Sequence, residues 1–120
     1  MDTVIENTSN KILVKNAHGY QIINFNDIIF CESMGSYTLI YLINDEKVLS
    51  SHILNEVEKQ LPANLFFRVN RSFLVNINFI KSYNCNPCKS VMLQNKKEIK
   101  ISMRKNSKFV AFLRNNFPLV

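Results

Sequence analysis

The stretch FRVNRSFLVN, residues 67–76, begins with the alternation of a β-strand and then departs from it. Apolar and polar residues alternate as far as Asn70, which is the pattern of a strand with one buried face. If the alternation continued, Arg71 would lie on the buried face, where an unpaired guanidinium is very costly. The stretch therefore predicts that the strand ends near Val69.

The residues around Arg71 predict a tight corner. Asn70 and Ser72 are residue types that favour turns and caps, and we expect Ser72 to cap a single helical turn over residues 73–75, closed by Asn76. Such a corner frees Arg71 from the core and directs Asn70 and Arg71 outward. A fork-shaped guanidinium on a rigid corner suits a guanine edge or a phosphate.

Charge is divided unevenly along the 120-residue chain. Residues 1–60 hold four lysines and eight acidic residues, a net charge of −4, whereas residues 61–120 hold eleven basic residues and one acid, a net charge of +10. Clustered cations that displace counterions from a phosphate backbone gain affinity, so this asymmetry favours a nucleic-acid partner. The alternative is that the basic half only keeps a small domain soluble.

Composition indicates one ordinary globular domain over residues 1–120. The apolar fraction is 47%, with only two glycines and three prolines, and the frequent Ile, Val, Phe and Tyr residues favour strands. No apolar run approaches the roughly 18 residues that span a bilayer, and the acidic start lacks the apolar core of a signal peptide. We expect a cytoplasmic protein with no membrane partner.

Short β-rich runs between turn residues predict about eight to ten strands. Besides the strand that ends near Val69, they are residues 11–16, 20–24, 28–33, 37–42, 47–51, 79–84, 90–94 and 98–102. Helical spacing of apolar residues predicts two or three short helices, one capped by Ser51 and ended by Pro62, and one over the last residues from Ser102. The expected fold is mainly β, with antiparallel β-sheets and two or three short helices.

The sequence carries no catalytic or metal-binding pattern. Cys85 and Cys88 form a C-x-x-C, but they fall in an expected turn between strands and lack the further paired ligands of a zinc site. Glu56 and Glu58 are two residues apart on a helix, so they do not face one site and are interpreted as solvated surface. With no phosphate loop and no hydrolase motif, we expect no enzyme, no metal and no cofactor.

The C-terminal helix begins with cations at the end where the helix dipole disfavours them. Ser102 is a natural N-cap, Arg104 and Lys105 lie in the first turn, and Lys108 follows just beyond. Free amides together with cations hold a phosphate well. An exposed basic helix that tolerates a small penalty is the alternative interpretation.

Three segments resemble the LytTR-type DNA-binding domain, the output domain of LytR-like and AgrA-like response regulators. FFRVNRSFLVNINFIKSY, residues 66–83, is similar to the family pattern F-x-R-x-H-R-S-[FY]-x-V-N. DIIFCESMGSYTLIYL, residues 27–42, resembles its D-I-x-[YF]-x-E-x-x-x-x-[YH] stretch, and ISMRKNSKFVAFL, residues 101–113, resembles its closing S-x-R-x-x-x-x-F helix. The resemblance covers about residues 10–117.

The resemblance implies a compact arrangement of antiparallel β-sheets and a function in bacterial transcription regulation within two-component systems. In this family, loops rather than a recognition helix enter successive major grooves of repeated promoter sites in double-stranded DNA. A second copy on DNA and contact with RNA polymerase are expected partners. The family commonly joins this domain to an N-terminal receiver, which this sequence lacks, so the chain either acts alone or is part of a longer protein, and its sequence does not identify the input signal.

The resemblance also implies which residues contact DNA. The base-reading positions are Tyr37 in the SMGSY loop, Arg71 and Arg104, and the neighbouring contacts are Asn70, Ser72, Lys105 and Lys108. Arg68 matches the motif as well, and we expect it to be an internal ion-pair partner. Asn70 stands where the family usually has histidine, which changes the donor pattern at that position.

Two other functions remain open on sequence alone. A small β-domain that binds RNA or single strands would carry exposed aromatic side chains stacked on a sheet face, where Tyr37 is the one aromatic residue singled out. An interaction module with a merely basic surface would show no salt-linked affinity for nucleic acid.

Overall fold

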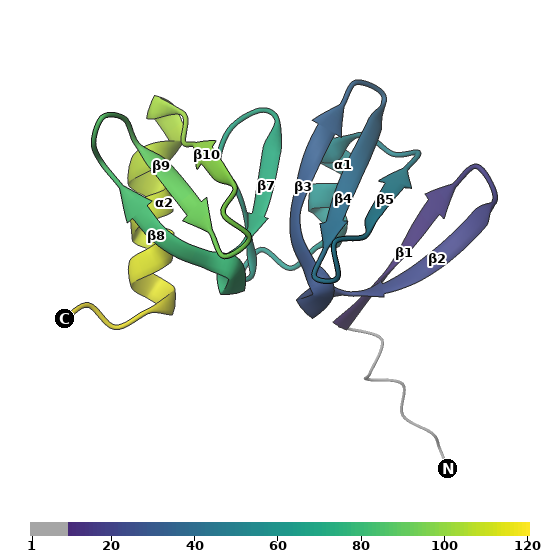
Figure 1. Ribbon diagram of the computed structural model, residues 1–120, viewed down its shortest axis with the longest axis horizontal. Coiled ribbons are helices and arrows are strands. Elements are labelled where there is room, and N and C mark those ends of the chain that lie inside the picture. The colour runs from purple at the N-terminus through teal and green to yellow at the C-terminus, as the bar shows by residue number, and fades with distance from the viewer. Residues whose placement is uncertain (1–9) are drawn as a thin grey trace, which may run out of the picture.

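Three antiparallel β-sheets lie side by side along the longest axis of the molecule (Figure 1). The computed structural model describes residues 10–120 of the chain. The acidic start, where we expected no signal peptide, falls largely in residues 1–9 and lies outside the described residues.

The first sheet is the hairpin of β1 (Lys11–Asn16) and β2 (Gly19–Asn24). The central sheet has the strand order β5-β4-β3-β7-β6, with β3 (Ile28–Met34), β4 (Tyr37–Leu42), β5 (Lys47–Ser50), β6 (Phe66–Arg68) and β7 (Phe73–Asn76). The third sheet has the order β10-β9-β8, with β8 (Ile80–Asn84), β9 (Ser90–Leu93) and β10 (Glu98–Lys100). The helices are α1 (Leu54–Gln60) and α2 (Met103–Asn116), and short 3-10 turns lie at η2 (Phe25–Asp27) and η3 (Ile77–Phe79).

The predicted fold class is confirmed. The ten strands of residues 10–120 pair antiparallel throughout, and the hairpin, the β3-β4-β5 meander and the third sheet lie where alternation and turn residues predict them. Cys85 and Cys88 fall in the turn between β8 and β9, as expected, and Cys85 is exposed. Neither helix of the described residues is long and apolar enough to cross a membrane.

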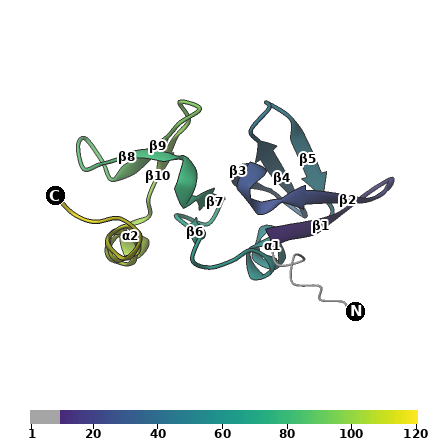
Figure 2. The same cartoon turned by 90° about the horizontal axis from the view of Figure 1, so that it is seen from below.

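Two hydrophobic cores lie on opposite faces of the central sheet. The first packs α1 and the hairpin against one face, and the second packs the third sheet and α2 against the other. Figure 2 shows α1 close to β1 and α2 close to the third sheet. Adjacent residues of β3 point into different cores, Cys31 into the first and Phe30 into the second. Burial raises the pKa of the Cys31 thiol to about 12, so this side chain acts as a neutral core residue.

The predicted helical turn over residues 73–75 is wrong, because these residues form β7. This strand lies between β3 and β6, with Leu74 opposite Cys31 and Val75 opposite Phe30. Leu74 enters the first core and Val75 the second, so both faces of the strand are buried. A strand that is buried on both faces has a continuous run of apolar residues and no alternation of apolar and polar ones. Because this alternation is missing in residues 73–75, the sequence pattern did not predict a strand there.

The predicted cap of α1 is also wrong. The apolar face is as expected, with Leu54 and Val57 buried, but the helix begins after Ile53 and has no side-chain cap. Ser51 lies too far before the helix to cap it, and its hydroxyl donates instead to the carbonyl oxygen of Lys15 at 3.2 Å.

A buried asparagine ties the turns below the central sheet together. The side chain of Asn76 is inaccessible to solvent and donates to the carbonyl oxygens of Phe25 (3.3 Å) and Ile28 (2.9 Å). Its own oxygen accepts from the amide of Asn78 at 2.9 Å, which caps η3. Asn76 therefore caps the 3-10 turn that follows β7 and does not close a helical turn before it.

We predict that Asn76→Ala lowers the free energy of unfolding by about 1–3 kcal/mol, because it leaves buried backbone groups without a partner. Urea unfolding of the 120-residue chain measures this change. Asn78→Ala is the matched control, since the Asn78 side chain is exposed and its loss should change stability by no more than about 0.5 kcal/mol. Equal effects of the two substitutions would contradict the structural role given to Asn76.

Candidate nucleic-acid interface

Three connections lie at the same end of the strands and form what we call the loop edge. They are the turn between β3 and β4, the corner at residues 70–72 between β6 and β7, and the start of α2, all at the top of the molecule in Figure 1. These segments are far apart in sequence but meet at the loop edge. Each of them carries residues that we expected to contact DNA.

The corner at residues 70–72 is the centre of the loop edge, because hydrogen bonds join it to both neighbours. The amide of Ser33 at the end of β3 donates to the carbonyl oxygen of Ser72 at 2.8 Å. On the other side, the amide of Ser102 donates to the carbonyl oxygen of Val69 at 2.9 Å. The corner is thus fixed relative to the β3–β4 turn and to α2.

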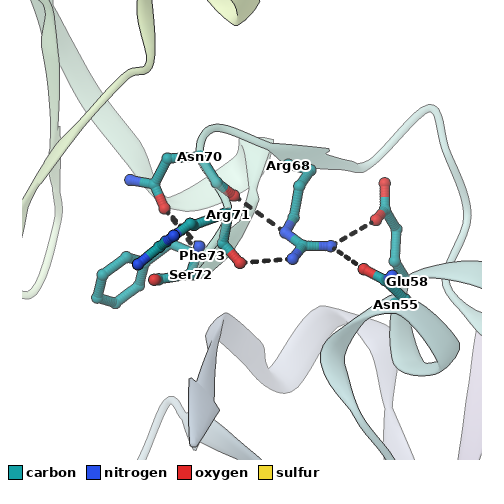
Figure 3. A network of polar contacts seen from close by, with 7 residues as sticks. All are labelled: Asn55, Glu58, Arg68, Asn70, Arg71, Ser72 and Phe73. Atoms are coloured by element: carbon teal, nitrogen blue, oxygen red, sulfur yellow. Dashed lines mark hydrogen bonds and ion pairs between the residues drawn. The ribbon is translucent and has the colours of Figure 1, made fainter. Parts of the chain in front are cut away.

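The guanidinium of Arg68 lies between the corner and α1, as Figure 3 shows. Its Nε donates to the carbonyl oxygen of Asn70 at 3.0 Å, and its Nη2 donates to that of Arg71. Its Nη1 donates to Asn55 Oδ1 (2.8 Å) and Glu58 Oε1 (3.0 Å) on α1. Arg68 is therefore an internal ion-pair partner, which is the role that we expected for it. Glu58 was expected to be only a solvated surface residue; its side chain is 42% exposed but also pairs with Arg68.

Asn70 turns its side chain into the chain and not outward as predicted. Its Oδ1 accepts from the amides of Ser72 (2.7 Å) and Phe73 (3.0 Å), and its Nδ2 donates to the carbonyl oxygen of Lys100 at 2.7 Å. Asn70, and not Ser72, is the residue whose side chain caps the amides of the corner. The backbone of the corner is therefore held by two side chains, those of Asn70 and Arg68.

Arg71 is free of the core, as the sequence predicted. The residue is exposed, and within the described part of the chain its guanidinium forms no hydrogen bond or ion pair. Figure 3 shows the side chain extending away from the Arg68 guanidinium. A fixed backbone with an unpartnered guanidinium is suited to bind an external acceptor.

The start of α2 adds cations to the same place. Ser102 occupies the N-cap position but its hydroxyl makes no cap bond, and the first turn holds no acidic residue. Arg104 and Lys108 are exposed and Lys105 is half-buried. The helix N-terminus thus offers positive charge and incompletely paired amides to an anion.

A hollow of about 510 Å³ brings some of the nominated residues together and leaves others outside. It is lined by Asn55, Glu58, Arg68, Asn70, Arg71, Ser102, Arg104 and Lys105. Since Glu58 pairs with Arg68, the charges of Arg71, Arg104 and Lys105 have no acidic counterpart among these lining residues. Lys108, Ser72 and Tyr37 do not line the hollow.

Tyr37 flanks the hollow from the other side of the corner. It is the first residue of β4, is 49% exposed, and pairs across the tight turn with Met34. The turn depends on Gly35, whose φ of +68° is a conformation that other residues rarely adopt. Tyr37 therefore lies on the loop edge, directly after the β3–β4 turn that the Ser33–Ser72 hydrogen bond joins to the corner.

Comparison with known proteins identifies the family. A family model described as the LytTr DNA-binding domain matches residues 18–114.

The chain belongs to the LytTR DNA-binding domain family.

This result confirms the resemblance seen in the three sequence segments. The family is one of DNA-binding domains of transcription regulators and is not an enzyme family.

Two relatives place the LytTR domain among known proteins. It is 36% identical over 73 residues to the transcriptional regulatory protein NatR of Bacillus subtilis (strain 168), a match that covers 61% of this chain and 31% of NatR. A solved LytTr DNA-binding domain from a Bacillus cereus protein has a TM-score of 0.74 at 24% identity and covers 87% of this chain and 96% of that one. The second relative shows that the three-sheet architecture is the fold of LytTR domains. The matched part of this chain spans about a third of NatR.

Sequence reasoning missed the contribution of α1 to the hollow. Asn55 and Glu58 line it only because the chain returns from α1 to place β6 beside them. The one available cue was that Glu58 is the last acid before a nearly acid-free half and that Arg68 is the first arginine after it. The direct contact of each nominated residue with DNA stays a prediction.

We predict that Asn70→Ala lowers the free energy of unfolding by about 1–2 kcal/mol, because two amides and one carbonyl oxygen lose their partner. It should also speed hydrogen exchange at the amides of Ser72 and Phe73, which is measured by NMR. Asn115→Ala, at an exposed position of α2, is the control and should leave stability unchanged or slightly raised. Unchanged exchange at both amides in Asn70→Ala would show that the corner does not depend on this side chain.

Proposed function

We propose that this LytTR domain regulates transcription by binding double-stranded DNA at specific sequences, with its loop edge in successive major grooves of repeated promoter sites. The observation that carries the proposal is the exposed guanidinium of Arg71, which has no partner among residues 10–120, on a corner fixed by two side chains beside the basic start of α2. Side chains that read bases must be held in register with the duplex, and the corner supplies that support.

Arg71 is the proposed base reader at the centre of the loop edge. Its planar fork matches the O6 and N7 acceptors of guanine in the major groove. Because Arg68 already holds the backbone of Arg71, only the side chain has to be ordered when Arg71 binds. Tyr37 and Arg104, on the two flanking segments, are the other proposed base-reading residues.

The remaining nominated residues are proposed contacts to the DNA backbone. Lys105 and Lys108 lie on the first turns of α2, where amides and cations together suit a phosphate. Ser72 keeps a free hydroxyl within the described residues, and the amide nitrogen of Asn70 retains a second N–H beside the one that binds the carbonyl of Lys100. These contacts add affinity and position the corner without reading sequence.

The alternative of RNA or single-strand binding finds no support in the comparisons. Such a domain needs several exposed aromatic side chains on one sheet face. Tyr20, Tyr37 and Phe117 are exposed but lie on β2, on β4 and after α2. This distribution favours duplex DNA as the partner.

We infer that one domain accounts for residues 1–120 and that two copies occupy repeated sites on bacterial DNA in the cytoplasm. RNA polymerase is a proposed partner of the DNA-bound regulator. NatR, which this chain matches over part of its length, is a transcriptional regulatory protein, and this supports a role in regulation.

We predict that Arg71→Ala weakens binding to a specific duplex by about 1–3 kcal/mol and removes discrimination at one base position. Duplexes selected from a random library by the wild-type chain supply the specific site, and a titration at fixed salt measures the affinity. Arg114→Ala removes the same charge from the far end of α2 and should leave discrimination unchanged. If Arg71→Ala unfolds the domain while the residual binding stays specific, the corner is structural and the proposal fails.

We predict that Lys108→Ala weakens all duplex sequences alike and reduces the salt dependence of binding by one contact. If about six phosphates are neutralised, log K against log salt has a slope near −5, and losing one contact makes it about 1 shallower. Titrations at several salt concentrations measure the slope, with single-stranded DNA and RNA as competitors. A flat salt dependence of the wild-type chain, or stronger competition by RNA than by duplex, would argue against duplex DNA as the target.

A further inference from the structure

Among the described strands at sheet edges, β2 is unprotected. Proteins shield edge strands from pairing with other chains by making them short, by placing charges on them or by interrupting them with bulges. β6 and β10 have three residues each, β5 carries Lys47 and meets β1 at its end, and β8 carries Lys81 and a register shift. β2 has six residues, no charge, no proline and an unbroken register with β1.

The free side of β2 offers both backbone groups and apolar side chains. Every second residue of an edge strand directs its N–H and C=O away from the sheet, and in the described residues β2 forms a ladder with β1 alone. Tyr20 and Ile22 are 65% and 67% exposed, and Leu13, opposite Ile22 on β1, is 60% exposed. We call these three side chains, together with the free backbone of β2, the β2 edge.

We propose that the β2 edge is an interface on which a second copy of this chain pairs its own β2, antiparallel, about a two-fold axis. In such a contact every residue meets the same surface of the partner, so a charged strand would face its own charge. Residues 16–26 contain no lysine, arginine, aspartate or glutamate, in a chain with a net charge of +6. β2 itself therefore gives a charged partner nothing to pair with, and the charge beside it is that of Lys15 on β1, whose Nζ lies 4.9 Å from the centre of the Tyr20 ring. A second β2 finds an equal length of neutral strand.

The position of the hairpin also favours self-pairing. β1 and β2 lie at one end of the molecule, and the third sheet and α2 lie at the other (Figure 1). The third sheet and α2 belong to residues 61–120, which carry the net charge of +10. Two copies that meet at their β2 edges therefore keep their basic halves far apart, and the repulsion between them is screened by salt over such distances.

Pairing at β2 leaves the loop edge free and sets how two copies meet DNA. Antiparallel pairing reverses the strand direction of the second copy, so the two loop edges face opposite ways along the strands. A dimer would then hold two separate stretches of duplex. This last consequence rests on the proposed function, whereas the pairing itself does not.

Sedimentation velocity of the 120-residue chain from about 1 µM to about 1 mM, the range of weak interfaces, tests the pairing. We expect a monomer–dimer equilibrium. Ile22→Lys sets two like charges against each other at the two-fold axis and should raise the dimer dissociation constant by about tenfold or more. Ile43→Lys adds the same charge at another exposed isoleucine, in the turn after β4, and should leave the equilibrium unchanged.

A wild-type chain that stays monomeric over this range, or an Ile22→Lys chain that dimerises as well as wild type, would overturn the interface. Circular dichroism verifies that Ile22→Lys is folded, and Tyr20→Lys is the second variant for the same measurement. Binding to a single duplex site should be the same in Ile22→Lys and wild type. A chain that dimerises through β2 but binds no DNA refutes the proposed function and leaves the interface standing.

Discussion

Between β6 and β7 the chain reverses direction over three residues, and such a sharp turn leaves backbone carbonyl oxygens without partners in the sheet. Arg68 supplies these partners, since its planar guanidinium donates hydrogen bonds to the carbonyl oxygens of Asn70 and Arg71 at the same time. The charge that this places below the corner is balanced by Glu58 from α1. This guanidinium therefore links the corner of the loop edge directly to α1, and Asn70 holds the same corner from its other side.

The carboxylate of Glu58 has a second effect on the electrostatics of the loop edge. It is one of the few acids near a strongly basic surface, and its pairing with Arg68 keeps it from neutralising Arg71, Arg104 or Lys105. A neutral internal pair therefore lies beneath uncompensated cations. An anionic partner therefore meets cations whose charge is not neutralised by neighbouring carboxylates. Such a surface favours fast and salt-dependent association.

Much of the fold follows from alternation and turn chemistry, and the errors have identifiable causes. Strands with one buried face were predictable because apolar and polar residues alternate along them. β7 was not predictable in this way, since its neighbouring residues Leu74 and Val75 are both buried, in two different cores. The caps expected at Ser51 and Ser72 rested on residue type alone, and the backbone path placed both hydroxyls elsewhere. The exposure of Arg71 was predictable from the cost of burying it, but the inward side chain of Asn70 was not, because it bonds to Lys100, 30 residues away.

The asparagine at the corner also bears on how the domain responds to acidity. The family pattern that this stretch resembles has histidine at this position, and histidine changes its number of hydrogen-bond donors as it titrates between about pH 5 and pH 8. The amide of Asn70 has no proton to gain or lose in that range, so its bonds to the amides of Ser72 and Phe73 persist throughout it. The hydrogen bonds that hold the backbone of Arg71 in this chain therefore do not depend on pH in this range. A histidine in place of Asn70 would be able to act as a pH sensor.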